Sequence, residues 1–351
     1  MTKPIQFSKT DIRSKSLTDI QLFFQNNQEQ SYRAKQVYEW LWKKSAVSFE
    51  SMTNLSNKTR ELLNEHFEIN AIKIHNSYKS TDGTQKFAFK LFDNEIIEGV
   101  LIPSESRVTA CISTQVGCQL GCKFCATGKL KFKRDLTAGE IYDQVAILQK
   151  QALEEYKINL SNIVIMGMGE PLMNFNNLMF AIDKITSPDG LGISPRRITL
   201  STVGISDMIV KLADLNVKFN LAISLHFAND IKRNEYIPIN KKYNIESIIK
   251  AIKYFYKKTE NRVTIEYILL KNINDNISDV KELVALCRNF PCKINLIEFN
   301  KVEHLLFDKT TDEKMSFFTN YLESKNLIVN VRRSKGGDIN AACGQLANKL
   351  V

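Results

Sequence analysis

Four of the seven cysteines of this 351-residue chain lie in one stretch, "CISTQVGCQLGCKFC", from Cys111 to Cys125. Cys118, Cys122 and Cys125 form a C-x3-C-x2-C pattern, and Cys111 lies seven residues before it. Thiolates bind zinc and iron–sulfur clusters alike. Structural zinc normally takes four protein ligands in two close pairs, whereas three thiolates on a four-iron cluster leave one iron open to an outside ligand. The pattern therefore favours a cluster site, and a ligand role for Cys111 stays open.

The cysteine stretch begins in the first of several apolar segments that alternate with helical ones. The expected strands are, in chain order, "RVTACIST", "SNIVIMGMG", "RRITLSTVG", "KFNLAISLH", "RVTIEYILL" and "KINLIEF". Each is nearly continuously apolar, which is typical of a parallel sheet covered by helices on both faces. The pattern predicts an α/β core of six β/α units.

Candidate site residues follow the ends of these expected strands. They are Gly169 and Glu170 after the second strand, Ser201 in the third, Ser224, Leu225 and His226 at the end of the fourth, and Asn300 after the sixth. In β/α barrels the carboxyl ends of the strands build the active site. We therefore expect these residues and the cysteine loop on one rim. Taken alone, "GMGEP" fits a tight strand–helix turn equally well, and His226 fits a routine polar residue.

The first 106 residues differ from this core. Residues 1–70 are expected to form a helical accessory domain, from "SLTDIQLFFQNN", "SYRAKQVYEWLWKK" and "SNKTRELLNEHF". Residues 71–106 are expected to form a short antiparallel β extension, and residues 107–351 the core with a C-terminal segment. Basic residues flank Trp40 and Trp42. They fit either a core helix with a solvated face or a surface that contacts RNA.

The net charge and the hydropathy of the sequence favour some classes of protein over others. The net charge of +10 suits a polyanionic partner such as nucleic acid. The sequence has no run of 18 apolar residues, and "MTKPIQFSKTDIRSK" has no apolar signal region, so we expect a cytoplasmic protein. In a reducing cytosol, clustered cysteines favour metal or catalytic chemistry over a disulfide scaffold.

Longer motifs resemble one family. They are "CISTQVGCQLGCKFCATG", "MGMGEPLMN", "SPRRITLSTVG", "LAISLH", "PINKKYNIE", "RVTIEY" and "DINAACGQL". Together they resemble the RlmN family of radical S-adenosylmethionine (SAM) enzymes, which methylate carbon 2 of adenine in RNA. The resemblance implies a partial (β/α)6 radical SAM barrel that uses a [4Fe–4S] cluster and SAM. It also implies 23S rRNA (adenine 2503, in the peptidyl transferase centre) and tRNA (adenine 37) as substrates. The Cfr-type alternative methylates carbon 8 of adenine, but "GEPL" at 169–172 is more similar to the carbon-2 branch.

The resemblance assigns roles to single residues. It implies cluster ligation by Cys118, Cys122 and Cys125, and SAM contacts from Gly169, Glu170, Ser201, Ser224, Leu225, His226 and Asn300. Cys343 would carry a methyl group to the base through a transient protein–RNA crosslink. Cys111 would release the product by forming a disulfide with Cys343, which an electron donor such as flavodoxin would then reduce. Glu98 matches the family's proton acceptor, although a solvent-exposed strand glutamate is the commoner case. We expect a monomer.

Features outside these motifs leave alternatives open. The basic loops "KLKFKRD" and "RRSKGGD" could hold RNA phosphates or be solvated surface. The stretch "NLIEFNKVEHL" lacks the prolines that the family often has after the sixth strand. Cys287 and Cys292 are expected to be small buried apolar side chains. A different class of protein, an RNA-binding module with a structural zinc site, also accommodates the cysteine pattern.

Overall fold

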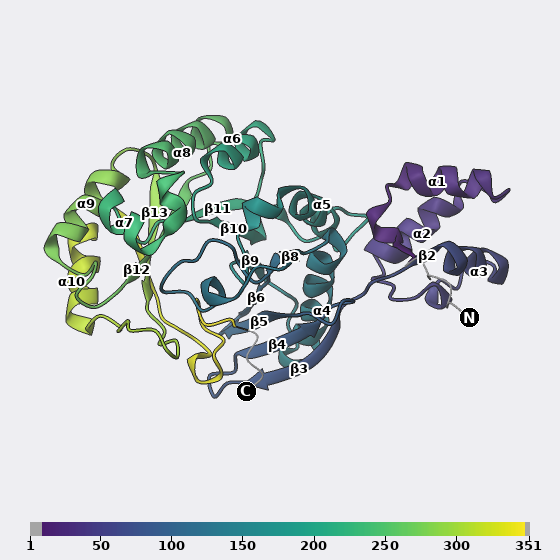
Figure 1. The fold of residues 1–351 in the computed structure, drawn as a ribbon, viewed down its shortest axis with the longest axis horizontal. Coiled ribbons are helices and arrows are strands. Elements are labelled where there is room, and N and C mark those ends of the chain that lie inside the picture. Colours follow the sequence, from purple (N-terminus) through teal and green to yellow (C-terminus); the bar gives the residue numbers. More distant parts are fainter. Residues whose placement is uncertain (1–8, 348–351) are drawn as a thin grey trace, which may run out of the picture.

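The parallel half of one large sheet carries the α/β core. The computed structural model describes residues 9–347, in which ten strands follow the order β14-β13-β12-β11-β10-β9-β6-β5-β4-β3 (Figure 1). The seven parallel strands are β6 (Arg107–Cys111), β9 (Asn162–Ile165), β10 (Ile198–Thr202), β11 (Asn220–Ser224), β12 (Val263–Leu269), β13 (Cys292–Glu298) and β14 (Ile328–Arg332). Six of them are the predicted strands, so the expected α/β class is confirmed.

The seventh parallel strand, β14, was not predicted. It pairs with β13 along Lys293↔Ile328 to Ile297↔Arg332 at one end of the sheet order. Its sequence, IVNVR, alternates in polarity, and its residues are exposed or half-buried. The sequence search relied on continuous apolar runs, which mark only strands that are buried on both faces.

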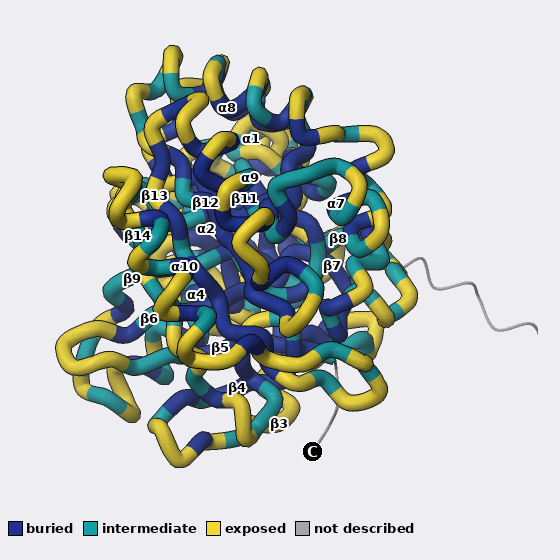
Figure 2. The backbone as a smooth tube through the Cα atoms, turned by 90° about the vertical axis from the view of Figure 1, so that its left-hand side faces the viewer, coloured by how far each residue is buried: buried dark blue, intermediate teal, exposed yellow. Residues whose placement is uncertain are grey.

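Helices follow the parallel strands and cover the sheet. They are α4 (Ala138–Tyr156), α5 (Phe175–Thr186), α6 (Ser206–Asp214), α7 (Asp230–Tyr236), α8 (Ile245–Thr259), α9 (Ile277–Cys287) and α10 (Asp312–Glu323). Thr137 and Glu140 form a capping box at the start of α4, which satisfies otherwise unpaired N–H groups. Figure 2 shows buried backbone through the strands, whereas helix surfaces and loops are exposed. Among the described residues, no helix is both long enough and apolar enough to cross a bilayer.

The predicted β extension continues the core sheet. Strands β3 (Lys73–Lys79), β4 (Gln85–Lys90) and β5 (Ile96–Ser104) form an antiparallel meander, and β5 pairs with β6. Left-handed residues make its turns, with φ of 86° at Gly83 and 66° at Asn94. Because β5 and β6 share hydrogen bonds, the extension is not separated from the core by a linker. The division of the chain at residues 70 and 106 therefore stays a proposal.

The N-terminal helices form a unit beside the core, at the right of Figure 1. They are α1 (Leu17–Asn26), α2 (Arg33–Trp42) and α3 (Asn57–His66), and the short strands β1 (Thr10–Asp11) and β2 (Phe67–Glu68) pair beside them. The Ser16 side chain caps α1 by accepting the Asp19 N–H. The Trp42 side chain is fully buried and meets the Tyr142 ring at 5.1 Å between centroids. Trp40 is only half-buried, and the Lys44 ammonium lies over its ring, 4.0 Å from the ring centroid. The two tryptophans therefore divide between core and surface.

Short elements complete the described chain. Strands β7 (Gln115–Val116) and β8 (Arg134–Asp135) pair across the cysteine loop. The 3₁₀ helices are Ile12–Ser14, Phe49–Ser51, Thr127–Lys129, Pro171–Asn174, Pro195–Arg197, Pro238–Lys241 and Gly337–Ile339.

Candidate active site

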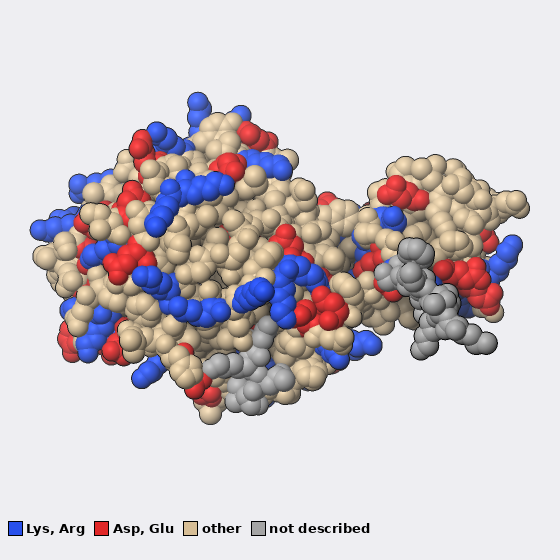
Figure 3. Space-filling model, viewed as in Figure 1, with Lys and Arg blue, Asp and Glu red and all other residues tan. Residues whose placement is uncertain are grey.

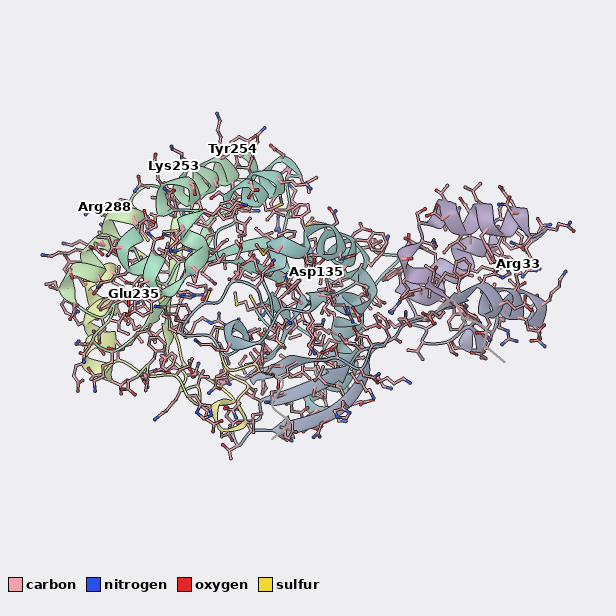
Figure 4. The ribbon with its side chains drawn as sticks, in the orientation of Figure 1. Arg33, Asp135, Glu235, Lys253, Tyr254 and Arg288 are labelled. Carbon is pink, nitrogen blue, oxygen red and sulfur yellow. The ribbon has the colours of Figure 1, made fainter. Side chains whose placement is uncertain are left out.

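The cysteine loop turns back on itself after β6. Gly117 has φ of +76°, and a Cβ at this position would lie 2.3 Å from the Lys131 carbonyl oxygen. A Cβ at Gly128 would lie 2.8 Å from the Cys122 carbonyl oxygen. At these two points only glycine allows the backbone segments to approach so closely. The Gln115 side-chain amide donates a hydrogen bond to the Asp135 carboxylate at 2.7 Å and helps to close the loop. Figure 4 labels Asp135 in the core, and it labels Arg33 on the N-terminal unit.

Three partly buried thiols lie on this loop, those of Cys118, Cys122 and Cys125. Burial raises the pKa of Cys118 to about 12, and it raises that of Cys122 further. Negative charge on Cys125 and Cys118 contributes to the raised pKa of Cys122. Within residues 9–347 no three side chains of the His, Cys, Asp and Glu types stand close enough to share a single metal ion. A donor set made only of thiols on a glycine-relieved loop fits an iron–sulfur cluster, whose irons bind one thiolate each.

The C-terminal segment carries Cys343 to this loop. The Gly344 carbonyl accepts the Ala126 N–H at 2.8 Å, and the Leu346 carbonyl accepts the Thr127 hydroxyl at 2.6 Å. From the other side, the Asn300 amide donates to the Cys343 carbonyl at 3.1 Å. Figure 1 shows the yellow C-terminal segment beside the loop that follows β6. Residues more than 200 positions apart therefore form one site.

The two predicted redox thiols are neighbours in the fold. Cys111 ends β6 and is buried, whereas Cys343 is solvent-accessible, and all seven cysteines are free thiols in the structure. Burial raises the pKa of Cys111 to about 12, and the next largest cause is the charge of Cys343. Although part of Cys343 is solvent-accessible, partial removal from water raises its pKa to about 11. Met166, at the end of β9, adds a backbone hydrogen bond to Cys111.

Glu98 is buried, contrary to the commoner expectation for a strand glutamate. Its residue exposure is 1%, and the equally buried Lys86 ammonium lies 3.1 Å from its carboxylate. The other carboxylate oxygen accepts the Ala347 N–H at 2.8 Å. Glu98 therefore contacts the segment that bears Cys343, and a buried lysine compensates its charge.

Gly169 and Glu170 follow β9 at the rim. Gly169 has φ of +101°, and a Cβ there would meet the Gln115 side chain at 2.6 Å. The Glu170 carboxylate accepts N–H groups from Val203 at 2.9 Å and Leu172 at 3.1 Å, and burial raises its pKa. The carboxylate thus ties the end of β9 to the end of β10. This leaves less of it for a cofactor ammonium than the sequence suggests.

The other predicted cofactor residues lie along the same rim. The Ser201 and Ser224 hydroxyls are 3.0 Å apart across β10 and β11. His226 has φ of +59° and accepts the Ile268 N–H at Nδ1 at 3.2 Å. Burial and the nearby Arg233 guanidinium lower the pKa of His226 to about 3, so the ring stays neutral. Its ring meets that of Phe124, in the cysteine loop, at 5.1 Å.

Much of the basic charge near the site is already paired. In "KLKFKRD", Lys133 binds Glu95 at 2.6 Å and Arg134 binds Asp93 at 2.6 Å, whereas Lys129 and Lys131 are exposed. In "RRSKGGD", Arg333 binds Glu298 at 2.8 Å. Figure 3 shows Lys and Arg in a band across this face, with acidic side chains beside them. The loops thus combine structural ion pairs with some free basic surface.

A cavity of about 400 Å³ lies beside the C-terminal segment. Its lining is Phe299, Asn300, Lys301, Phe307, Asp308, Lys309, Gly337, Asn340 and Gln345. The lining includes the loop after β13 that lacks the family's prolines. Cys287 and Cys292, by contrast, are buried away from the rim at the far ends of α9 and β13, as expected.

Sequence reasoning missed three charged residues at the site. Arg233 of α7 is fully buried and donates to the Leu225 carbonyl at 3.1 Å. Glu266 of β12 is buried, and Arg332 of β14 lies 3.5 Å from it. A carboxylate inside the apolar run "RVTIEYILL" was the available signal, since buried charges are rare unless they are paired.

Comparisons with known proteins identify relatives of this chain. Residues 112–287 match the radical SAM superfamily, and residues 10–69 match the ribosomal RNA large subunit methyltransferase N-terminal domain. The chain is 52% identical to a probable dual-specificity RNA methyltransferase RlmN of Cytophaga hutchinsonii over 100% of this chain and 96% of that protein. A protein with the same description from Flavobacterium psychrophilum is 50% identical over 99% of this chain and 100% of its own length. The crystal structure of a radical SAM methyltransferase from Sphaerobacter thermophilus superposes with a TM-score of 0.90 at 35% identity, covering 97% of this chain and 100% of the other.

Proposed function

The chain belongs to the RlmN family of radical SAM dual-specificity RNA methyltransferases, and we propose that Cys343, Cys111 and the cysteine loop form its methyl-transfer site. The family uses a [4Fe–4S] cluster and SAM, and it methylates rRNA and tRNA. Carbon 2 of adenine lies between two ring nitrogens and is too electron-poor to attack the SAM methyl group. The bound cofactors supply the one-electron chemistry that such a carbon needs.

One observation carries the proposal, which is the docking of the C-terminal segment on the cysteine loop. Its two contacts, Ala126 to Gly344 and Thr127 to Leu346, measure 2.8 and 2.6 Å. A methyl carrier has to lie next to both the cofactor site and the resolving thiol. Two observations support this role for Cys343. It directly precedes Gly344, which bonds to the residue after Cys125, and its charge contributes to the raised pKa of Cys111.

The remaining roles are those that the family resemblance implies. Cys118, Cys122 and Cys125 would hold the cluster. Gly169, Glu170, Ser201, Ser224, Leu225, His226 and Asn300 would line the SAM site on the rim. Cys343 would take the methyl group of a SAM molecule, forming an S–C bond as the methyl–sulfonium bond breaks, and its thiol proton would pass to solvent. The Cys111 thiolate would later attack the Cys343 sulfur as the S–C bond to the product breaks, and a reductant would return the resulting disulfide to two thiols by adding two electrons and two protons.

Glu98 is proposed to accept the proton that leaves the adenine ring. The Lys86 ammonium lies 3.1 Å from its carboxylate, and the hydrogen bond that the carboxylate accepts from the Ala347 N–H holds it beside the carrier segment. The target nucleotide has to leave its stack to reach such an enclosed site. The half-buried Trp40 with Lys44, and the exposed lysines near the cysteine loop, are proposed RNA contacts.

The cellular compartment and the electron donor are proposed from the nature of the substrates. An enzyme that modifies bacterial ribosomal RNA works in the cytoplasm, where a flavodoxin-type protein could supply electrons. We propose that the chain acts as a monomer, since this one sequence contains a match to every site residue that the family resemblance implies.

Nucleoside analysis tests the function directly. In digests of 23S rRNA and tRNA, 2-methyladenosine is expected in cells that carry the gene and absent from cells that lack it. The appearance of 8-methyladenosine instead would favour the Cfr-type alternative. Anaerobic purification is expected to give a brown protein with about four irons per chain. A colourless zinc protein with intact Cys118, Cys122 and Cys125 would contradict the proposal.

A further inference from the structure

The turn between β3 and β4 (residues 80–84) binds the C-terminal segment, and Figure 1 shows the two side by side. The Asp82 carboxylate in the turn accepts the Gly336 N–H at 2.8 Å. In the opposite direction, the Asp338 carboxylate of the C-terminal segment accepts the Ser80 hydroxyl at 2.6 Å. Each of the two segments therefore supplies an aspartate that binds the other.

Gly336 allows these two segments to approach so closely. Its φ is +68°, and a Cβ at this position would lie 2.8 Å from the Thr84 Cγ2 atom and 2.9 Å from the Ala341 Cβ atom. Thr84 is fully buried, so its side chain has no free space into which it could move. At Gly337, the next residue, a Cβ would meet nothing within 4 Å. Only the first of the two adjacent glycines in "RRSKGGD" is therefore required by the packing.

The turn between β3 and β4 is itself fixed to the core. The Tyr156 hydroxyl of α4 donates to the Gly83 carbonyl in the turn at 2.7 Å. Beside this contact, the Lys335 ammonium donates to the Pro103 carbonyl of β5 at 2.5 Å. The lysine of this basic loop thus bonds to the protein backbone and helps to attach the C-terminal segment to the β extension.

Cys343 lies between two attachments of the C-terminal segment. Before it, the Gly336 carbonyl accepts the Ala341 N–H at 2.8 Å, which closes a short loop two residues from Cys343. After it, the Gly344 carbonyl accepts the Ala126 N–H of the cysteine loop at 2.8 Å. A segment that is held on both sides of a residue leaves that residue less conformational freedom than a segment held on one side. The contact with the turn therefore restricts where Cys343 can lie.

We propose that Gly336 and Asp338 are positioning residues that hold Cys343 at the proposed methyl-transfer site, with the turn between β3 and β4 as their support. The inference rests on the proposed carrier role of Cys343, and it gives the β extension a part in the reaction. A carrier has to meet its methyl donor and the base in a narrow range of positions, and a displacement of about 1 Å can slow such a reaction up to about a hundredfold. Both residues would act through the position of Cys343 rather than on the reacting atoms.

Hydrogen exchange tests the attachment without relying on turnover. The full-length reduced holoenzyme is diluted into deuterated buffer, and peptide mass spectrometry follows the backbone amides of residues 338–347. In Gly336→Ala these amides are expected to exchange about tenfold faster than in wild type, because the added Cβ displaces the segment from Thr84. Gly337→Ala is the matched control and should exchange like wild type, since its Cβ meets nothing. Equal exchange rates in the two variants would overturn the inference.

Steady-state methylation distinguishes positioning from RNA binding. In Asp338→Ala, kcat for 2-methyladenosine formation is expected to fall about tenfold while KM for the RNA stays unchanged. Asp338→Asn keeps an oxygen that can accept the Ser80 hydroxyl, so it should retain more of kcat than Asp338→Ala. Asp189→Ala removes an exposed aspartate of the loop after α5 and should behave like wild type.

Three kinetic results would contradict the proposal. A raised KM with unchanged kcat in Asp338→Ala would assign the loop to RNA binding instead. An unchanged kcat in a variant whose exchange is accelerated, or a kcat as low in Asp338→Asn as in Asp338→Ala, would also count against it. If Gly336→Ala does not fold, Asp338→Ala replaces it in the exchange experiment, because Asp338 is exposed. Methylation by a Cys343→Ala variant would refute the carrier role, whereas the exchange rates would still report on the attachment, so the two failures are distinguishable.

Discussion

Cys111 and Cys343 are separated by most of the chain and are neighbours in the fold. Their environments differ, because Cys111 is buried at the end of a strand and Cys343 is accessible on a loop. An accessible thiol suits a group that must meet both a methyl donor and a base. A buried thiol beside it suits a group that acts only on its neighbour.

Replacing Cys111 should trap the crosslink. In Cys111→Ala the bond between Cys343 and the base can form but cannot be resolved, so a covalent protein–RNA species should accumulate. A denaturing gel with labelled RNA measures it. Cys287→Ala removes a buried cysteine remote from the site and should turn over like wild type. Normal turnover of Cys111→Ala without an adduct would show that Cys111 is not the resolving thiol.

Replacing Cys343 should separate methylation from SAM cleavage. In Cys343→Ala no sulfur can carry the methyl group, so methylated adenosine should fall below detection. The cluster ligands lie on another segment, so slow SAM cleavage should persist. Chromatography of the reaction products measures both. Retained methylation would remove Cys343 as the carrier.

His226 should make stability depend on pH. The pKa of His226 is about 3 in the folded protein, whereas the ordinary histidine value, which applies to the unfolded chain, is 6.5. The unfolded chain therefore binds the proton more strongly than the folded protein does. The stabilisation is complete above pH 6.5 and is lost as pH falls towards 3, by up to about 1.4 kcal/mol per pH unit. In urea unfolding between pH 7 and pH 5, His226→Asn should lose stability less steeply than wild type, and the exposed His75→Asn should behave like wild type. Identical slopes for His226→Asn and wild type would contradict this.

At the scale of elements, the site depends on a loop that must fold back and on strands that must end together. Glu170 and Arg233 tie the ends of β9, β10 and β11 through backbone groups rather than through a ligand. In the folded chain, buried charged side chains that form hydrogen bonds with backbone polar groups fix the positions of loops, with little further loss of conformational entropy. These bonds therefore fix the positions of the loops that form the rim.

Two glycines of the cysteine loop offer a matched test of its geometry. Both Gly117 and Gly121 have positive φ, but a Cβ at Gly117 would lie 2.3 Å from a backbone oxygen whereas one at Gly121 would meet nothing within 4 Å. Gly117→Ala must displace backbone and is expected to lose most of the bound iron. Gly121→Ala incurs only strain of roughly 1 kcal/mol and should keep nearly all of it. Iron analysis after reconstitution measures this, and equal iron contents would refute the argument.

At the scale of the whole molecule, the N-terminal unit is attached to the core by a buried contact. Arg13 binds Asp143 of α4 at 2.7 Å, and both side chains are largely buried. Asp143 also accepts the Ile72 N–H at 3.1 Å, where the chain enters the β extension. This single carboxylate thus links all three proposed parts. A firm attachment would keep the proposed RNA-binding surface in fixed relation to the active site.

Breaking this ion pair should destabilise the protein strongly. Arg13→Met leaves Asp143 buried and uncompensated, and a cost of about 3–5 kcal/mol in the free energy of unfolding is expected. Adding Asp143→Asn removes the unpaired charge and should recover much of the loss. Lys44→Met removes an exposed partner of Glu39 and should cost less than about 1 kcal/mol. Urea unfolding measures all three, and a cost for Arg13→Met as small as that for Lys44→Met would contradict the prediction.

The sequence by itself determined the local features of this protein. The spacing of the three cysteines, the helix caps and the apolar strands each depend on residues that are close together in the chain. The cluster ligands Cys118, Cys122 and Cys125 and the six parallel strands could therefore be predicted from the sequence. The long motifs also indicated the family, which the comparisons confirm. The individual roles of Cys111 and Cys343 came from the resemblance and stay predictions.

Only the tertiary structure decided what lies beside what. It placed Cys343 against Cys111, buried Glu98 against Lys86, and paired Arg134 and Arg333 with carboxylates. It also added β14, whose polar alternation hid it, and with it Arg332. The physical reason is that burial and charge pairing depend on contacts between distant segments, which no local pattern of residue types specifies.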